Sequence, residues 1–424
     1  TDNTVYYCYK DRQDNLWLAL SRGIAKVEVA NPITFYNDKN GLHGSVETAS
    51  FFDGTFYVGT FTGLFYKENG YFSKVKGISS QCWDLEVFKV PEGKRKLLLG
   101  TSNGLYSIDN KKPIQIDDQL NTCFDLYQLE SDPSTIFLAT SAGFFKMEYQ
   151  NGRWTNKEKI LNNNYTYRKI IRDDNGIFWL STELHGIVKV EFEEGNYSEP
   201  IKVQEYDTSY GFKNLSNIKA YFLNNRIFAG AKDQLYMYNR EEDRFVPDTV
   251  FSKYLPGNLM YAYRMVKDSA GNIWFSPEST YNQPIGFLKP VNGYAYEWVE
   301  KPLMRLPKMD IYLLLPDESE VTWIGGTEGL YKYDGKKQYI GESDHFPVLV
   351  RKVSINPDSV IFHGAYTGKK SSRTLVTRDQ PKTFKPVLSY KHNDITFNVS
   401  ASSYNNVDLI EFQYFLDGYD KQWS

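Results

Sequence analysis

The sequence predicts an all-β chain: a β-propeller of seven or eight four-stranded blades, followed by an incomplete immunoglobulin-like β-sandwich. Three observations lead to this prediction. A short motif recurs eight times, helical periodicity is almost absent, and aromatic residues are abundant, with 33 Tyr, 27 Phe and 8 Trp. Aromatic side chains favour pleated, half-buried surfaces, and a repeat of about 20 to 50 residues is typical of propellers and other repeat folds.

The repeated motif is clearest at Val321–Tyr333, where an apolar run, a small polar break with Gly and Thr, and a second alternating run follow one another. The residue that opens the second strand of each copy recurs every 40 to 49 positions, at Trp17, Tyr57, Leu98, Leu138, Trp179, Phe228, Trp274 and Trp323. We therefore expect one blade per copy.

The second copy shows how a blade is built. Two dipeptides that favour tight hairpins, Asp53-Gly54 and Asn69-Gly70, separate its apolar runs. The expected strands are Val46–Phe52, Thr55–Thr60, Leu64–Lys67 and Tyr71–Val75. A glycine follows the second strand in six copies and is expected at a turn, at Gly23, Gly63, Gly104, Gly143, Gly186 and Gly329. The Trp of the second strand is expected to pack between blades.

Two domains are expected, 1–346 and 347–424. Residues 1–40 are either a blade of this ring or the last blade of an upstream propeller, so the ring has eight blades or seven. The insertion Pro277–Pro284 is either a functional loop or a tolerated surface insertion. In the second domain, strands are expected at Phe346–Ser354, Asp394–Ser400 and Leu409–Leu416, the last because its apolar residues alternate. Three or four strands are too few for a complete sandwich, which has about seven.

Composition excludes several classes of function. The formal net charge of −3 and the pI near 6.1 argue against a nucleic-acid partner or an anionic membrane. No apolar run is long enough to span a membrane, so contact with one is expected only through a helix downstream of this chain. Cys82 and Cys123 occupy the same place in consecutive repeats, and are either two buried thiols or a pair.

Catalytic chemistry finds little support. No pair of cysteines or histidines has the spacing of metal ligands. The five histidines are scattered along the chain, at His43, His185, His345, His363 and His392. No nucleophile elbow or phosphate loop occurs. The carboxylate pairs, such as Asp173-Asp174, lie at turns, where hydrogen bonding to the backbone is the simpler role. We expect no catalytic residue, no metal and no cofactor.

Ligand binding is better supported, because the loops that enter the innermost strands of a propeller converge on its axis. The candidate ligand-binding residues at that position are His43, Trp83, Tyr167, Arg168, Asn217, Tyr261, Tyr263, Arg264, Asp310 and Tyr312, with Phe124 at the same register. Aromatic rings suit the C–H face of a sugar, while charged and amide groups bind its hydroxyl groups and carboxylates. Arg168 and Arg264 favour an acidic oligosaccharide.

The repeats also resemble a known family. Asp173–Ile187 and Trp323–Tyr331 are similar to the two-component-regulator propeller repeat, and Phe412–Ser424 resembles the start of a sandwich module named for its three tyrosines. This order of modules is that of the sensor region of hybrid two-component systems in Bacteroides-type gut bacteria. Members usually have two seven-bladed propellers, the sandwich module, one membrane helix, and then histidine kinase, receiver and DNA-binding domains.

The resemblance implies a periplasmic sensing region of an inner-membrane histidine kinase. It would detect glycan oligosaccharides, form a homodimer through the sandwich module and control polysaccharide-utilisation genes, without enzyme activity in this chain. Two other classes remain open, a protein-docking scaffold and a propeller hydrolase or lyase.

Overall fold

The computed structural model describes most of the chain, as residues 4–11, 15–29, 31–90, 93–257, 262–281, 283–293, 295–337, 347–355, 359–370, 373–377, 386–392, 394–404 and 410–424. The chain divides into two compact units. The larger is Glu28–Tyr339, and the smaller combines Thr1–Val27 with Ile340–Ser424. No helix among the described residues is long and apolar enough to cross a membrane.

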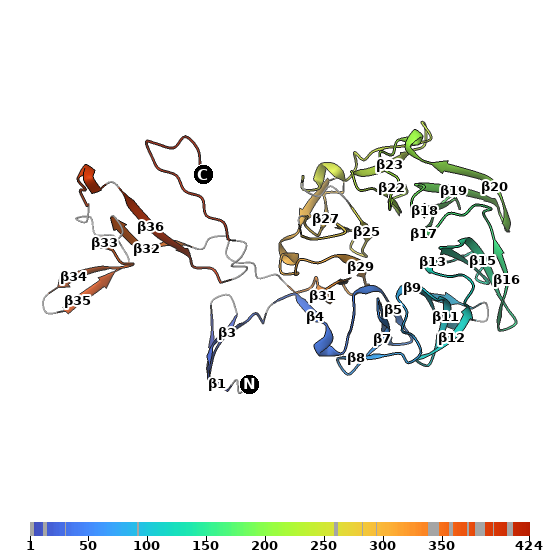
Figure 1. Ribbon diagram of the computed structural model, residues 1–424, viewed down its shortest axis with the longest axis horizontal. Coiled ribbons are helices and arrows are strands. Elements are labelled where there is room, and N and C mark those ends of the chain that lie inside the picture. Colours follow the sequence, from blue (N-terminus) through green and yellow to red (C-terminus); the bar gives the residue numbers. More distant parts are fainter. Residues whose placement is uncertain are drawn as a thin grey trace. The chain divides into compact units, whose positions relative to one another are not determined.

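The larger unit is a ring of seven four-stranded antiparallel sheets, as far as the chain is described. Figure 1 shows β9, β13 and β17 on the inside of the ring and β16 and β20 on the outside. The first three blades are β5–β8 (Val46–Phe52, Thr55–Thr60, Gly63–Glu68, Tyr71–Lys74), β9–β12 (Cys82–Lys89, Arg95–Thr101, Gly104–Asp109, Lys112–Asp117) and β13–β16 (Cys123–Gln128, Thr135–Thr140, Gly143–Gln150, Arg153–Lys159).

The next three blades follow the same order: β17–β20 (Tyr167–Arg172, Phe178–Thr182, Ile187–Glu193, Asn196–Tyr206), β21–β24 (Lys219–Leu223, Arg226–Gly230, Leu235–Asn239, Arg244–Pro247) and β25–β28 (Arg264–Lys267, Ile273–Ser276, Gly286–Val291, Ala295–Val299). Short 3-10 helices lie in the connections, at η1 Asp38–Asn40, η2 Thr208–Tyr210, η3 Ser252–Tyr254 and η4 Lys301–Leu303. The strands expected for the second copy are confirmed to within one residue at each end.

The seventh blade closes the ring with strands from both ends of the unit. It contains β29 (Ile311–Pro316), β30 (Val321–Gly326) and β31 (Gly329–Asp334), and its outer strand is β4 (Ile33–Tyr36). Strand β4 pairs with β31 from Ile33↔Tyr333 to Tyr36↔Leu330. This pairing covers an edge of β31 that would otherwise be open. The alternative of an eight-bladed ring is therefore wrong.

The first repeat lies outside the ring. Strands β1 (Val5–Lys10), β2 (Leu16–Leu20) and β3 (Gly23–Val27) form a separate three-stranded sheet within the smaller unit. The ring therefore occupies Glu28–Tyr339, not 1–346, and residues 33–36 belong to its seventh blade, not to the first repeat. Whether this sheet belongs to an upstream propeller stays a prediction.

Three of the four recurring tryptophans, Trp179, Trp274 and Trp323, pack between blades, as expected, whereas Trp17 lies in the separate sheet of the smaller unit. Trp179 and Trp274 are 1% and 2% exposed, and the ring of Trp323 lies 4.4 Å from that of Phe56 in the first blade. Asp173 holds Trp179 in place: its Oδ2 accepts a hydrogen bond from the indole Nε1 at 3.2 Å, and its Oδ1 accepts two from backbone N–H groups of its turn. The structural role expected for this carboxylate is confirmed.

Two other local predictions can be checked. All six turn glycines have positive φ, and at Gly63 a Cβ would lie 2.5 Å from the carbonyl oxygen of Ile78, so no other residue fits there.

Cys82 and Cys123 are free, fully buried thiols. Burial raises the pKa of both thiols, to about 12 at Cys82, which makes them unreactive.

The smaller unit also contains strands from the C-terminal part of the chain. Its three-stranded sheet has the order β33-β32-β36 (Ser359–Phe362, Val348–Ile355, Ile395–Ala401), and β34 (Tyr366–Lys370) pairs with β35 (Arg373–Thr377). One further 3-10 helix, η5, is Tyr390–His392. Whether these sheets form a sandwich stays a prediction.

The strand expected at Leu409–Leu416 is not formed at residues 410–416, and Leu409 lies outside the described residues. Tyr414 exchanges two backbone hydrogen bonds with Ser424, and Tyr414 and Leu416 are 69% and 61% exposed. The alternation of apolar and polar residues is not sufficient to form a strand here. A pair of extended segments that lacks a third strand is only marginally stable.

Candidate functional site

Five innermost strands of the ring share a one-residue irregularity near their first residue. At each, the pairing with the second strand skips one residue, and the skipped residues are Glu47, Trp83, Phe124, Arg168 and Tyr312. A β-bulge of this kind leaves one residue unpaired and redirects its side chain. The repeated bulge explains why variable side chains of different blades gather at one end of the axis.

Arg168 and two aromatic residues from neighbouring blades form the first half of the site. The guanidinium carbon of Arg168 lies 3.9 Å from the ring centroid of Phe124 and 5.0 Å from that of Trp83. The two rings meet edge to face at 5.0 Å, and Trp83 Nε1 donates to Ser102 Oγ at 3.2 Å. Cation–π contacts of this geometry fix the planar guanidinium group in place.

Lys219, Tyr263 and Arg264 form the second half. Lys219 Nζ lies 3.5 Å from the ring centroid of Tyr263, and the guanidinium carbon of Arg264 lies 5.6 Å from the same ring. The hydroxyl group of Tyr221 donates to the carbonyl oxygen of Tyr263 and holds that residue in position. We call the six residues of both halves the axial cluster: Trp83, Phe124, Arg168, Lys219, Tyr263 and Arg264. All six are half-buried.

Positive charge is crowded in the axial cluster. Burial lowers the pKa of Lys219 well below its ordinary value, and the neighbouring charges of Arg264, Lys169 and Arg168 lower it further. Burial also lowers the pKa of Arg168. Within the described part of the chain, Arg264 Nε is buried without a hydrogen-bond partner, and no carboxylate forms an ion pair with Arg168, Lys219 or Arg264.

Several carboxylates lie around this positive charge, among them Glu183, whose charge opposes the lowering of the Arg168 pKa by burial. Burial raises the pKa of Glu47, against the opposing influence of Arg264 and of a 3.2 Å hydrogen bond from Gln81. Tyr312 lies 3.5 Å from Asp310 Oδ2, and burial together with Asp310 raises the pKa of Tyr312 to about 12. Within the insertion, Ser279 forms an isolated β-bridge with Asp310, and the charge of Glu278 partly offsets the lowered pKa of Lys219.

The structure thus brings together Trp83, Phe124, Arg168, Tyr263 and Arg264, with Asp310 and Tyr312 beside them. Lys219 and Glu47 were missed. Glu47 occupies the bulge for which the sequence suggested His43. Strand β5 begins at Val46, as expected, so His43 lies in the loop before the strand and not at the bulge. Lys219 could have been found as the first residue of an innermost strand, two positions after Asn217.

The remaining candidates lie elsewhere. Tyr167 is fully buried between the third and fourth blades, because it points to the opposite face of β17 from the bulged Arg168. His43 is exposed, with its Nδ1 2.7 Å from Asp38 Oδ1. Asn217 has a φ of 55° in the turn before β21, where its N–H donates to the carbonyl oxygen of Glu183. Tyr261 lies outside the described residues.

A second layer of carboxylates lies further along the innermost strands. Asp84 Oδ2 accepts a hydrogen bond from the N–H of Leu126, and Asp125 Oδ2 accepts one from that of Ile170, each in the following blade. Burial raises the pKa of both carboxyl groups. These residues join adjacent blades. Among the described residues, no group of three or more His, Cys, Asp or Glu side chains could hold a metal ion.

The fold is shared with extracellular domains of known two-component systems. No protein-family model and no curated protein matches the sequence. The extracellular domain of a hybrid two-component system from Bacteroides thetaiotaomicron covers 99% of this chain at 18% identity, with a TM-score of 0.72. The extracellular domain of a second hybrid system of this bacterium covers 85% at 14% identity, with a TM-score of 0.55. This chain spans 56% and 50% of the lengths of those two chains, and it shares their propeller fold.

Proposed function

We propose that this chain is part of the extracytoplasmic, ligand-sensing region of a hybrid histidine kinase, and that it binds an acidic oligosaccharide at the axial cluster. The likeness in fold to extracellular domains of two-component systems supports the sensing role. The crowding of cations and aromatic rings on the innermost strands supports the choice of ligand.

One observation carries the proposal: Arg168, Lys219 and Arg264 are half-buried together without a paired carboxylate among the described residues. Gathering like charges away from water is unfavourable unless an anion completes the site. A carboxylate or sulfate group on a sugar would accept charge-assisted hydrogen bonds from the two guanidinium groups. The rings of Trp83 and Phe124 offer apolar faces for the sugar itself.

Signalling requires a ligand that binds one arrangement of the protein more tightly than another. Five blades contribute to the axial cluster through their innermost strands, so a bound ligand would favour one mutual arrangement of these blades. In the proposed mechanism the smaller unit passes this change toward the inner membrane. A homodimer that responds in this way would control genes for the use of the polysaccharide from which the ligand is derived.

Calorimetry on the 424-residue chain tests the proposal. The ligands are a panel of oligosaccharides, each containing uronic acid or sulfate, and their neutral counterparts. Acidic members are expected to bind, and the double variant Arg168→Ala/Arg264→Ala is expected to lose at least tenfold in affinity while its circular dichroism is unchanged. If no oligosaccharide binds, or if the double variant binds acidic members as well as the wild type, the proposed ligand class is wrong. An unchanged variant would favour a docking scaffold.

A further inference from the structure

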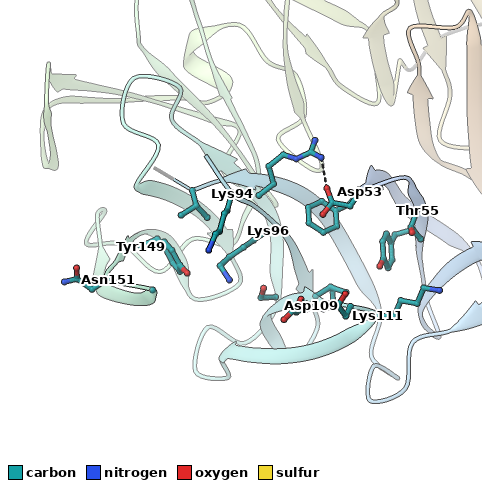
Figure 2. A pocket seen from close by; sticks show the side chains of 16 residues that line it. Asp53, Thr55, Lys94, Lys96, Asp109, Lys111, Tyr149 and Asn151 are labelled. Atoms are coloured by element: carbon teal, nitrogen blue, oxygen red, sulfur yellow. Dashed lines mark hydrogen bonds and ion pairs between the residues drawn. The ribbon is translucent and has the colours of Figure 1, made fainter. Parts of the chain in front are cut away.

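A cleft lies at the end of the innermost strands opposite to the axial cluster. It has a volume of about 770 Å³ and is bordered by hairpin turns of the first three blades (Figure 2). Strand β9 contains Trp83 of the axial cluster as its second residue and ends at Lys89, one residue before Val90 of the cleft lining. Six residues of strand span about 20 Å, so the two sites are separate. We call it the hairpin cleft.

Positive charge also exceeds negative charge in the hairpin cleft. Its charged lining residues are Asp53, Lys94, Arg95, Lys96, Asp109 and Lys111. Arg95 is paired with Asp53 at 2.6 Å, and Lys111 with Glu68 at 3.2 Å. In the part of the chain that the structure describes, Lys94 and Lys96 have no ion pair. Two amines are therefore available to a ligand.

The strand geometry places these two amines together. Successive side chains of a strand point to opposite faces. Arg95 reaches toward Asp53 and Phe52 of the first blade, whereas Lys96 Nζ lies 5.4 Å from the ring centroid of Tyr149 in the third blade. Figure 2 shows Lys94 beside Lys96, both extending toward the side of the cleft where Tyr149 lies.

Tyr149 supplies the apolar part of this corner. Its ring packs against Trp154 at 5.0 Å and Phe88 at 6.0 Å, which hold it half-buried at the cleft edge. An aromatic ring beside two amines suits a ligand with a ring face and an anionic substituent. The volume lies within the range of about 300 to 1,000 Å³ that is usual for small-molecule sites.

We propose that the hairpin cleft binds a small acidic sugar, with its carboxylate, sulfate or phosphate group between Lys94 and Lys96 and its ring against Tyr149. This would be a second ligand site, independent of the axial cluster. Each chain would then hold two anionic ligands, one at each end of the innermost strands.

Ligand-observed NMR and calorimetry on the 424-residue chain test this, with glucuronate, glucose 6-sulfate and glucose 6-phosphate as probes and glucose as the neutral reference. The acidic probes are expected to bind at least tenfold more tightly than glucose. Tighter binding of the two esters would identify a dianion as the preferred group, and tighter binding of glucuronate a carboxylate. Both outcomes support the proposal.

Matched variants locate the site. Lys94→Ala/Lys96→Ala is expected to weaken binding of the acidic probes at least tenfold. The control Lys76→Ala/Lys112→Ala removes the same charge from exposed positions outside the cleft and should change nothing. The axial variant Arg168→Ala/Arg264→Ala should retain this binding. A failure of the hairpin-cleft proposal can therefore be distinguished from a failure of the proposed function. Equal binding of glucose, or equal affinity in the Lys94/Lys96 variant and its control, would overturn the proposal.

Discussion

Arg168 of β17 lies over the ring of Phe124 in the neighbouring blade, with 3.9 Å between the guanidinium carbon and the ring centroid. Both residues are the skipped residues of their strands. The bulge therefore does two things at once: it frees a side chain from the blade, and it places that side chain against its counterpart in the next blade. A charged ligand would meet a guanidinium group whose orientation is already fixed.

Substitutions at Arg168 should distinguish the contribution of its positive charge to ligand binding from the contribution of its planar, stacked guanidinium group. Arg168→Lys keeps the positive charge but loses the planar group that stacks on Phe124. We expect Arg168→Ala to weaken binding of an acidic oligosaccharide about 10- to 100-fold, equivalent to about 1.4 to 2.7 kcal/mol, and Arg168→Lys to recover only part of this loss. Calorimetry gives the affinities. Full recovery by lysine would show that the stacked geometry is unimportant.

Anion binding at the axial cluster should take up a proton. In the free protein burial and three neighbouring cations lower the pKa of Lys219, and a bound anion would raise this pKa again. Affinity should therefore fall as the pH rises through the pKa of Lys219 in the free protein. Calorimetry in buffers of different ionisation enthalpy measures the proton uptake. Lys219→Met should abolish it, and uptake that persists in this variant would exclude Lys219 as the group responsible.

The sequence predicted the blades well because hairpin signals and alternation are local. At Asp53-Gly54 and Asn69-Gly70 the turn chemistry alone sets the strand ends. Closure of the ring is different, because it depends on the pairing of β4 with β31, which lies almost 300 residues later in the sequence. Nothing local distinguishes Ile33–Tyr36 from the last strand of the first repeat, so the number of blades had to remain open.

The candidate site was predictable only in part. Trp83 and Arg168 were found because the repeat fixes their register, which also revealed Phe124. The register of the repeat predicts the position of a residue along a strand. It does not predict the bulge, which determines the face of the sheet to which the side chain points. This is why Tyr167, one residue before the bulge, was included and is buried. Lys219 was missed because its significance comes from Arg264 and Arg168, which come from other blades.

The hydrogen bond between Asp173 and Trp179 should contribute strongly to stability. Asp173→Ala would leave the buried indole N–H and two turn N–H groups without their acceptor, and each unsatisfied buried donor costs about 1 to 3 kcal/mol. We expect a loss of about 2 to 4 kcal/mol in the free energy of unfolding, measured by denaturant titration. Asp174→Ala is the matched control, because Asp174 is the exposed neighbour in the same turn. Equal losses in both variants would contradict the role assigned to Asp173.

Glu86 should make the ring less stable as the pH rises. Burial, with the nearby charge of Asp125, raises the pKa of Glu86 to about 7 from an ordinary value of 4.5. The native protein thus binds a proton that the unfolded chain releases between about pH 4.5 and 7, and stability falls across this interval by on the order of 3 kcal/mol at most. Glu86→Gln keeps the shape without the titration, so its melting temperature should exceed that of the wild type at pH 8 and approach it at pH 4.5. A parallel pH dependence in the two proteins would contradict this assignment.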